Sequence, residues 1–91
     1  MNCLGNLKGN TQNDFYEMDF EEDFEEDYCV DLDISNYPFL ETIVVKNNSL
    51  KNLNSLKICN NLVLKTIEVG DSSFSNVNNL VIQSIIHYID I

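Results

Sequence analysis

The residues of this sequence that could carry chemistry are mainly acidic and lie in one tract. Eleven of the fifteen acidic residues fall between Asp14 and Asp33, and none of the five lysines lies in that range. Such dense carboxylates, with Asp31 and Asp33 two positions apart, could attract a divalent cation. A calcium loop also needs defined ligand spacing, a glycine at its turn and a terminal glutamate, and this arrangement is missing. We therefore expect diffuse attraction of counterions and no metal or cofactor.

Histidine, cysteine and glycine offer no set of catalytic residues. His87 is the only histidine, and it lies in an apolar run where no serine or cysteine forms a recognisable motif with it. Cys29 and Cys59 fall on or beside positions of the apolar pattern described below, where they are expected to fill core or corner sites. Gly70 stands alone, without the surrounding glycines of a phosphate-binding loop. The sequence therefore predicts that the chain is not an enzyme and that Gly70 is a turn residue.

Charge and length divide the chain into two regions. The 91 residues make one domain at most, and the net charge of −10 is concentrated in the first third. From Ile34 onward, four lysines balance four acidic residues. This contrast predicts a flexible N-terminus with an acidic-aromatic tract over residues 1–28, followed by a second region over residues 29–91. The strong negative charge would repel nucleic acid, so none is expected as a partner.

Hydropathy and cysteine usage indicate the compartment. No apolar stretch approaches the roughly 20 residues that cross a bilayer, and the N-terminus lacks the apolar core of a signal peptide. Cys3, Cys29 and Cys59 are odd in number and have no metal-ligand spacing, which is typical of reduced thiols. The expectation is an intracellular, cytoplasmic protein without a membrane segment.

The acidic tract is compatible with two secondary structures. Tyr16, Met18 and Phe20 alternate as in a strand, whereas Phe20, Phe24 and Tyr28 lie four apart as on one face of a helix. The tract could be a solvated, partly disordered spacer, a cap whose aromatic residues cover the first winding of the repeat, or a recognition element for a basic partner. The sequence leaves these alternatives open.

The second region repeats with a period of 24 residues. Residues 40–58 align with residues 64–82, and every apolar anchor then meets an apolar partner. The pairs are Leu40 with Leu64, Ile43 with Ile67, Val45 with Val69, Leu50 with Phe74, Leu53 with Val77, Leu56 with Leu80 and Ile58 with Ile82. The form L-x-x-L-x-I occurs twice in each period, which predicts two extended segments per winding. Their alternating apolar residues should face inward and stack on those of the next winding.

The pattern continues on both sides of the aligned residues. Stepping back by 24 extends it to Cys29, and stepping forward from Leu64 and Ile67 lands on Tyr88 and Ile91. Because the sequence ends there, halfway through a repeat and without a polar cap, we expect a fragment of a longer array or a degenerate gene product. Exposed apolar edges would then favour self-association through the open ends of the solenoid.

The spacing and the period resemble those of leucine-rich repeats. Residues 73–80, SFSNVNNL, look like the A-F-x-x-C-x-x-L block of the BspA-like subclass, with Ser73 in place of alanine and Val77 in place of cysteine. The resemblance covers roughly 60 of the 91 residues. It implies a leucine-rich-repeat solenoid over residues 29–91, mainly β and of the right-handed β/α superhelix type, with about 2.5 to 3 coils. The acidic N-terminal segment would be disordered or would cap it.

The predicted function is a protein-binding or structural scaffold module without catalysis. Its partner protein is not indicated by any motif. Side chains flanking the inward anchors form the expected partner-contact set, which is Thr42, Val44, Lys46, Ser55, Lys57, Glu68 and Val81. The alternative function is that of an acidic-aromatic disordered interaction segment attached to a degenerate repeat remnant.

Overall fold

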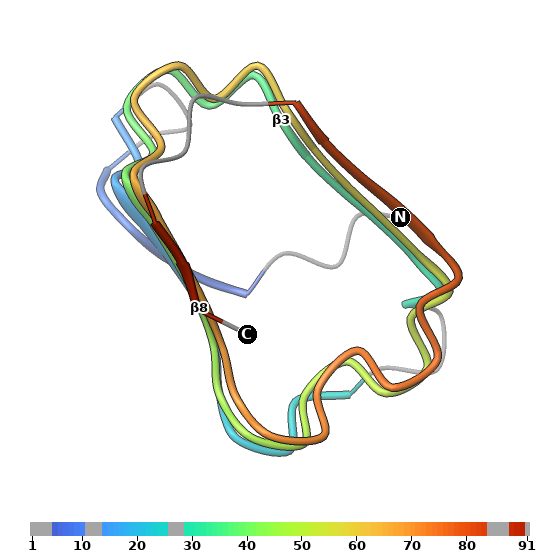
Figure 1. Cartoon of the computed structure of the whole chain (residues 1–91). Coiled ribbons are helices and arrows are strands. Elements are labelled where there is room, and N and C mark those ends of the chain that lie inside the picture. The colour runs from blue at the N-terminus through green and yellow to red at the C-terminus, as the bar shows by residue number, and fades with distance from the viewer. Residues whose placement is uncertain (1–4, 11–13, 26–28, 84–87, 91) are drawn as a thin grey trace.

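The chain folds into strands joined by turns and bends, and no helix occurs among the described residues (Figure 1). The computed structural model describes residues 5–10, 14–25, 29–83 and 88–90. Its strands are β1 (Asn6–Lys8), β2 (Glu17–Phe20), β3 (Asp31–Ser35), β4 (Thr42–Val45), β5 (Ser55–Cys59), β6 (Thr66–Val69), β7 (Asn79–Gln83) and β8 (Tyr88–Asp90). The part of the chain that is described therefore has no helix long and apolar enough to cross a membrane.

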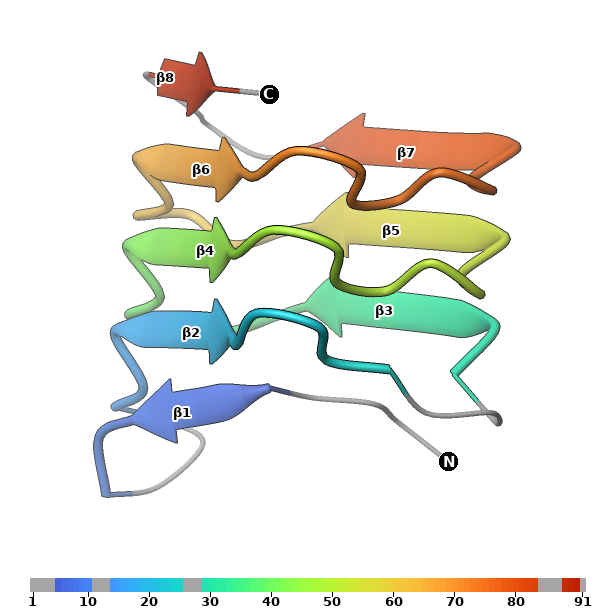
Figure 2. The same ribbon diagram turned by 90° about the horizontal axis from the view of Figure 1, so that it is seen from below.

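The strands form two sheets that the chain visits in turn. The first sheet has the order β1-β2-β4-β6-β8, and the second has the order β3-β5-β7. All neighbouring strands are parallel except β1, which is antiparallel to β2. Figure 2 shows this alternation, with one strand of each sheet in every winding. Apart from the β1–β2 pair, each strand pairs with a strand one winding away and not with its neighbour in sequence.

The strand register confirms the predicted pairing of residues 24 apart. Ile43 lies opposite Ile67 between β4 and β6, and Leu56 lies opposite Leu80 between β5 and β7. The last step is different, because Ile67 pairs with Ile89 and not with the predicted Ile91. The last winding is thus shorter by two residues than the period of the sequence.

The core lies between the two sheets and is built from the inward residues of each strand. In β3 and β4 buried and more exposed residues alternate, as expected for strands with one face against a core. The largest fully buried side chains include Met18, Phe20, Leu32, Ile34, Leu40, Ile43, Leu50, Leu53, Ile58 and Leu64. Cys29 and Cys59 are also buried, as predicted.

Asparagine residues close the same corner of two neighbouring windings. Asn36 and Asn60, which are 24 residues apart, follow β3 and β5 with φ angles of 65° and 57°, a left-handed conformation that asparagine tolerates well. The next residue of the second corner, Asn61, is fully buried. Its Oδ1 accepts a hydrogen bond from the Tyr37 N–H at 2.9 Å, and its Nδ2 donates to the Ile34 carbonyl at 2.8 Å. These bonds tie neighbouring corners together.

The predicted leucine-rich-repeat solenoid of the β/α superhelix type, with its BspA-like subclass, is wrong. The described residues form two small, mostly parallel sheets with no helix, and the molecule measures 28 × 24 × 20 Å. Its radius of gyration of 12.0 Å is that of a compact globule of this length, for which about 12 Å is expected. The physical reason is that both extended segments of each period become strands, so the turns use the remaining residues and none are left for a helix.

The acidic tract contributes to the sheet and its core. Met18 and Phe20 are fully buried in β2, so the strand alternative is confirmed for residues 17–20, and this part of the tract is not disordered. The Phe20 and Phe24 rings also meet edge to face at 5.5 Å. Tyr28 lies outside the described residues. The predicted domain boundary between residues 28 and 29 borders on this undescribed part, so it stays a prediction.

The cysteines differ from the prediction of reduced thiols. Cys29 is disulfide-bonded, so that prediction is wrong for this residue. Cys59 keeps its thiol and is buried at the end of β5. Cys3 lies outside the described residues.

Candidate interaction surfaces

The predicted partner-contact residues fall on two separate faces. Thr42, Val44 and Glu68 lie on the outer side of the first sheet, and Lys46 follows β4 at its end. The other three predicted residues, Ser55, Lys57 and Val81, lie on the outer side of the second sheet. The two sheets occupy opposite sides of the ring that the chain traces in Figure 1. The structure therefore divides the predicted ribbon into two sets, and their role as contact residues stays a prediction.

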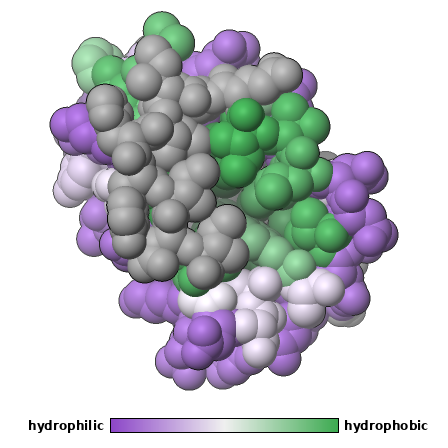
Figure 3. Space-filling model, in the orientation of Figure 1, coloured by the Kyte–Doolittle hydropathy of each residue, from purple (hydrophilic) through white to green (hydrophobic). Residues whose placement is uncertain are grey.

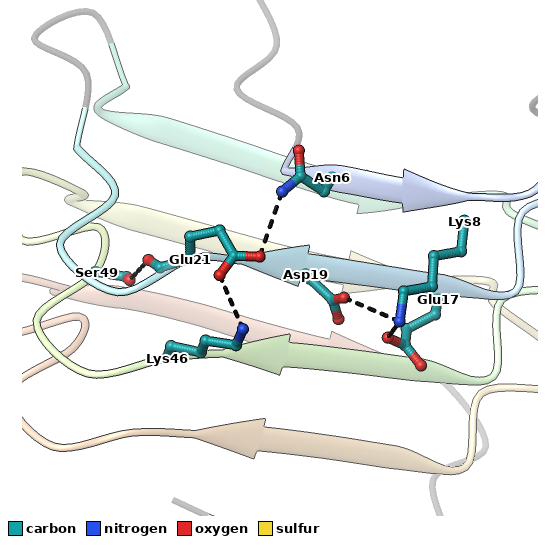
Figure 4. Close-up of polar contacts among 7 residues, drawn as sticks. All are labelled: Asn6, Lys8, Glu17, Asp19, Glu21, Lys46 and Ser49. Atoms are coloured by element: carbon teal, nitrogen blue, oxygen red, sulfur yellow. Dashed lines mark hydrogen bonds and ion pairs between the residues drawn. The ribbon is translucent and has the colours of Figure 1, made fainter.

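A network of charged residues covers the N-terminal part of the first sheet (Figure 4). Lys8 of β1 lies opposite Glu17 of β2, and its Nζ is 2.6 Å from the Glu17 carboxylate and 3.5 Å from that of Asp19. A second ion pair joins Lys46 to Glu21 at 2.8 Å. The network links β1 to β2 and places each of its three carboxylates beside a lysine.

The pKa values of the two carboxylates nearest Lys8 are shifted in opposite directions. The hydrogen bond from Lys8 lowers the pKa of Glu17 below its ordinary value. Burial, and then the hydrogen bond with Glu17, raise the pKa of Asp19. Asp19 is only 8% exposed, and its Oδ1 has no hydrogen-bond partner in the described part of the protein. The ionised form of Asp19 is therefore the least well accommodated charge of this network.

Exposed apolar side chains gather at one corner of the windings. Phe39 is 57% exposed, Leu62 67% and Val63 38%, while Leu40 and Leu64 directly after them are fully buried. We call Phe39, Leu62 and Val63 the corner patch. Phe39 and Val63 are 24 residues apart, so neighbouring windings present them at equivalent turns. This patch was not predicted from the sequence, because the expected contact residues were chosen only among positions that flank the inward anchors on the strands. The signal was present as apolar residues that repeat outside the L-x-x-L-x-I frame.

The last strand of the second sheet forms a second apolar surface. Leu80 of β7 is 54% exposed, although its equivalents Leu32 and Leu56 are 2% and 4% exposed. Val81 on the outer side is 41% exposed. Figure 3 shows apolar surface at this end of the molecule, beside the residues drawn in grey. The inward face of β7 is thus only partly covered.

No group of three or more histidine, cysteine or acidic residues suited to a metal ion occurs among the described residues. His87 lies outside them. Gly70 follows β6 and directly precedes the turn that begins at Asp71, and its N–H donates a hydrogen bond to the Val45 carbonyl at 2.7 Å.

Comparisons with known proteins give no family for this chain. No protein-family model, no curated protein and no solved structure matches it. Its function must therefore be inferred from the surfaces themselves.

Proposed function

We propose that this chain is a protein-binding module that contacts its partner through the corner patch. The observation that carries the proposal is the exposure of Phe39, Leu62 and Val63 at equivalent turns of two neighbouring windings. Clustered, exposed apolar side chains at the surface of a folded protein are typical of interaction sites. Phe39 supplies an aromatic ring, the kind of side chain that often anchors such interfaces.

The corner patch is held by a rigid support. Leu40 and Leu64 fix the end of each turn in the core, and both are fully buried. Asn61 fixes its beginning through the two hydrogen bonds to Tyr37 and Ile34 described above. A patch that is fixed before binding loses little conformational entropy on association, and this favours affinity.

The net charge of the chain indicates which charge the partner is expected to carry. The patch is followed by Glu41, whose carboxylate is 3.2 Å from Lys65 and half exposed. The whole chain carries a net charge of −10. Such a field attracts basic proteins and accelerates their association. We therefore expect a partner whose contact region is apolar and surrounded by lysine or arginine.

Part of the predicted contact set adjoins the patch. Thr42 and Val44 belong to β4, which begins three residues after Phe39, and Glu68 belongs to the next strand of the same sheet. These residues would extend the contact along the first sheet. The alternative function as a disordered acidic-aromatic segment is not favoured, because Met18 and Phe20 of the acidic tract are fully buried.

Selection from a random peptide library displayed on phage tests the proposal. The immobilised chain should enrich peptides that combine apolar and basic residues, and the Phe39→Ser/Leu62→Ser variant should retain at least tenfold fewer of them. Val30→Ser is the matched control, because Val30 is an exposed apolar residue (40%) outside the patch. Circular dichroism and urea unfolding should show that all three proteins are folded. Equal enrichment by the chain and the double variant would contradict the proposal.

A further inference from the structure

The strand β7 lacks the charges that protect the other outer strands. Outer strands in the described part of the chain are β1 and β8 in the first sheet and β3 and β7 in the second. The sequence of β1 includes Lys8, that of β3 includes Asp31 and Asp33, and that of β8 includes Asp90. The sequence of β7, NLVIQ, has no charged residue and no proline. Charges and prolines on edge strands are the usual means of preventing pairing with another chain, so β7 is open to such pairing.

The inward side of β7 is incomplete in the same place. Leu80 lies opposite Leu56, and it covers Leu56 so well that only 4% of that residue is exposed. Leu80 itself remains 54% exposed, and Ile82 is partly buried. A further strand beside β7 would cover Leu80 as β7 covers Leu56. A further strand would therefore pair with the open backbone edge of β7 and also cover the Leu80 side chain.

The distribution of charge favours a second copy of this chain as that occupant. No charged residue occurs in residues 72–83, whereas the acidic strands β2 and β3 lie toward the opposite end of the stacked strands (Figure 2). Two copies that meet at β7 keep both acidic tracts at the far ends of the pair. A basic partner, by contrast, would find no carboxylate on β7. A head-to-tail stack is obstructed, because the antiparallel strand β1 closes the first sheet at the other end.

We infer that two copies of this chain associate through β7, with the two strands antiparallel about a two-fold axis at Val81. In this register Val81 faces Val81 of the other copy, and Leu80 faces Ile82. Leu80 and Ile82 are two residues apart, so both point toward the core side. The pairing joins the second sheets of both copies and covers both Leu80 side chains. This interface is separate from the corner patch, and it goes beyond the proposed function and does not depend on it.

Sedimentation velocity over a range of concentrations tests the association. The chain should form a dimer, and Val81→Lys should raise the dissociation constant about tenfold or more, because two like charges would then lie directly opposite each other. The fold should accept this change, since Lys57 already occupies the equivalent position of β5, the register partner of Val81. Val30→Lys is the matched control, with the same substitution at a similarly exposed valine (40% against 41%), and it should leave the dissociation constant unchanged.

Cross-linking tests the arrangement. Val81→Cys treated with a short thiol-reactive cross-linker should give covalent dimers, because directly opposed residues of antiparallel strands have Cβ atoms about 5 Å apart. Lys57→Cys, one strand away from the interface, and the unsubstituted chain should give few. The inference is overturned if the chain is a monomer at all concentrations, if Val81→Lys leaves the dimer intact, or if the dimer persists while Val81→Cys does not cross-link. A failed peptide selection would not affect any of these results.

Discussion

The outer strands β1 and β7 lie at opposite ends of the stacked strands and differ in construction. The strand β1 is short, runs antiparallel to its neighbour and is held by the ion pair from Lys8 to Glu17. The strand β7 continues the parallel pattern, has no charge and leaves Leu80 exposed. The same inward position of a winding is thus buried in the middle of the molecule and open at one end. This difference shows that an apolar pattern determines where a residue points, but the neighbouring strand determines whether it is covered.

The largest expected effect compares two residues that the repeat makes equivalent. Leu56→Ala should lower the free energy of unfolding by about 3 kcal/mol, because it leaves a cavity in the core. Leu80→Ala should cost less than about 1 kcal/mol in the monomer, because over half of that side chain is already exposed. Urea unfolding of both variants at low protein concentration measures the difference. Equal losses would mean that Leu80 is covered in solution.

The second prediction concerns the end of the first sheet where β1 covers β2, and a substitution that should separate these two strands. A Cβ at Gly5 would collide with the backbone carbonyl oxygen of Asp19, so Gly5→Ala should displace β1 from β2. We expect a loss of about 2 kcal/mol in the free energy of unfolding, in the range of overpacked sites, and faster amide hydrogen exchange in β2. Asn10→Ala is the control, because Asn10 is exposed and only its backbone N–H makes a described hydrogen bond. Unchanged exchange in β2 would show that the end is closed by something other than β1.

The third prediction concerns the charges that hold the closed end. Burial raises the pKa of Asp19, so ionisation of this group weakens the fold as the pH rises through the raised value. Asp19→Asn should therefore increase the free energy of unfolding by about 1 kcal/mol at pH 7. The gain should disappear below pH 3.8, the ordinary value for this group, where Asp19 is protonated in both the folded and unfolded states.

Glu17 is the control for Asp19, because its pKa is shifted in the opposite direction. Its pKa is lowered by Lys8, so its ionised form stabilises the fold above its ordinary value of 4.5, and this contribution is lost as the pH falls through the lowered value. Glu17→Gln should therefore destabilise the protein at pH 7 and not below the lowered pKa. Unfolding curves recorded between pH 3 and pH 7 measure both variants, and effects of the same sign would contradict the assignment.

The smallest expected effect is at an ion pair between the two ends. Lys65 and Glu41 lie 3.2 Å apart with side chains 60% and 49% exposed. Lys65→Gln should change the free energy of unfolding by less than about 0.5 kcal/mol, because exposed ion pairs contribute little. A larger loss of the free energy of unfolding, measured in urea, would indicate that this ion pair helps to fix the neighbouring corner patch.

The sequence predicted the pairing of strands better than the class of fold. Ile43 and Ile67 could be matched because every inward position of the repeat requires an apolar side chain, and this requirement is visible in sequence. The L-x-x-L-x-I spacing predicted two extended segments per winding, and the structure has two strands there. The class was wrong because the leucine-rich-repeat resemblance implied a β/α superhelix, and the described residues contain no helix.

The acidic tract was difficult for a different reason. Met18 and Phe20 carry the core pattern, but carboxylates at nearly all the intervening positions suggested a solvated segment. Those at Glu17 and Asp19 point to the outer side, where Lys8 meets them from β1. The position of Lys8 could not be predicted, because the sequence around it has no apolar period that would indicate a strand. The corner patch was missed because exposed and buried apolar residues look alike in sequence.

The alternation between two sheets also has a consequence for how the chain folds. Apart from β1 and β2, each strand pairs with a segment about two dozen residues away, as Ile43 does with Ile67. In the described residues, only the antiparallel β1–β2 pair is local, so there is little local structure to guide folding, and long loops must close before the other contacts form. A nascent chain on the ribosome would remain largely unstructured until two complete windings had emerged. We expect slow folding for a protein of this size, and a need for protection of its apolar segments during synthesis.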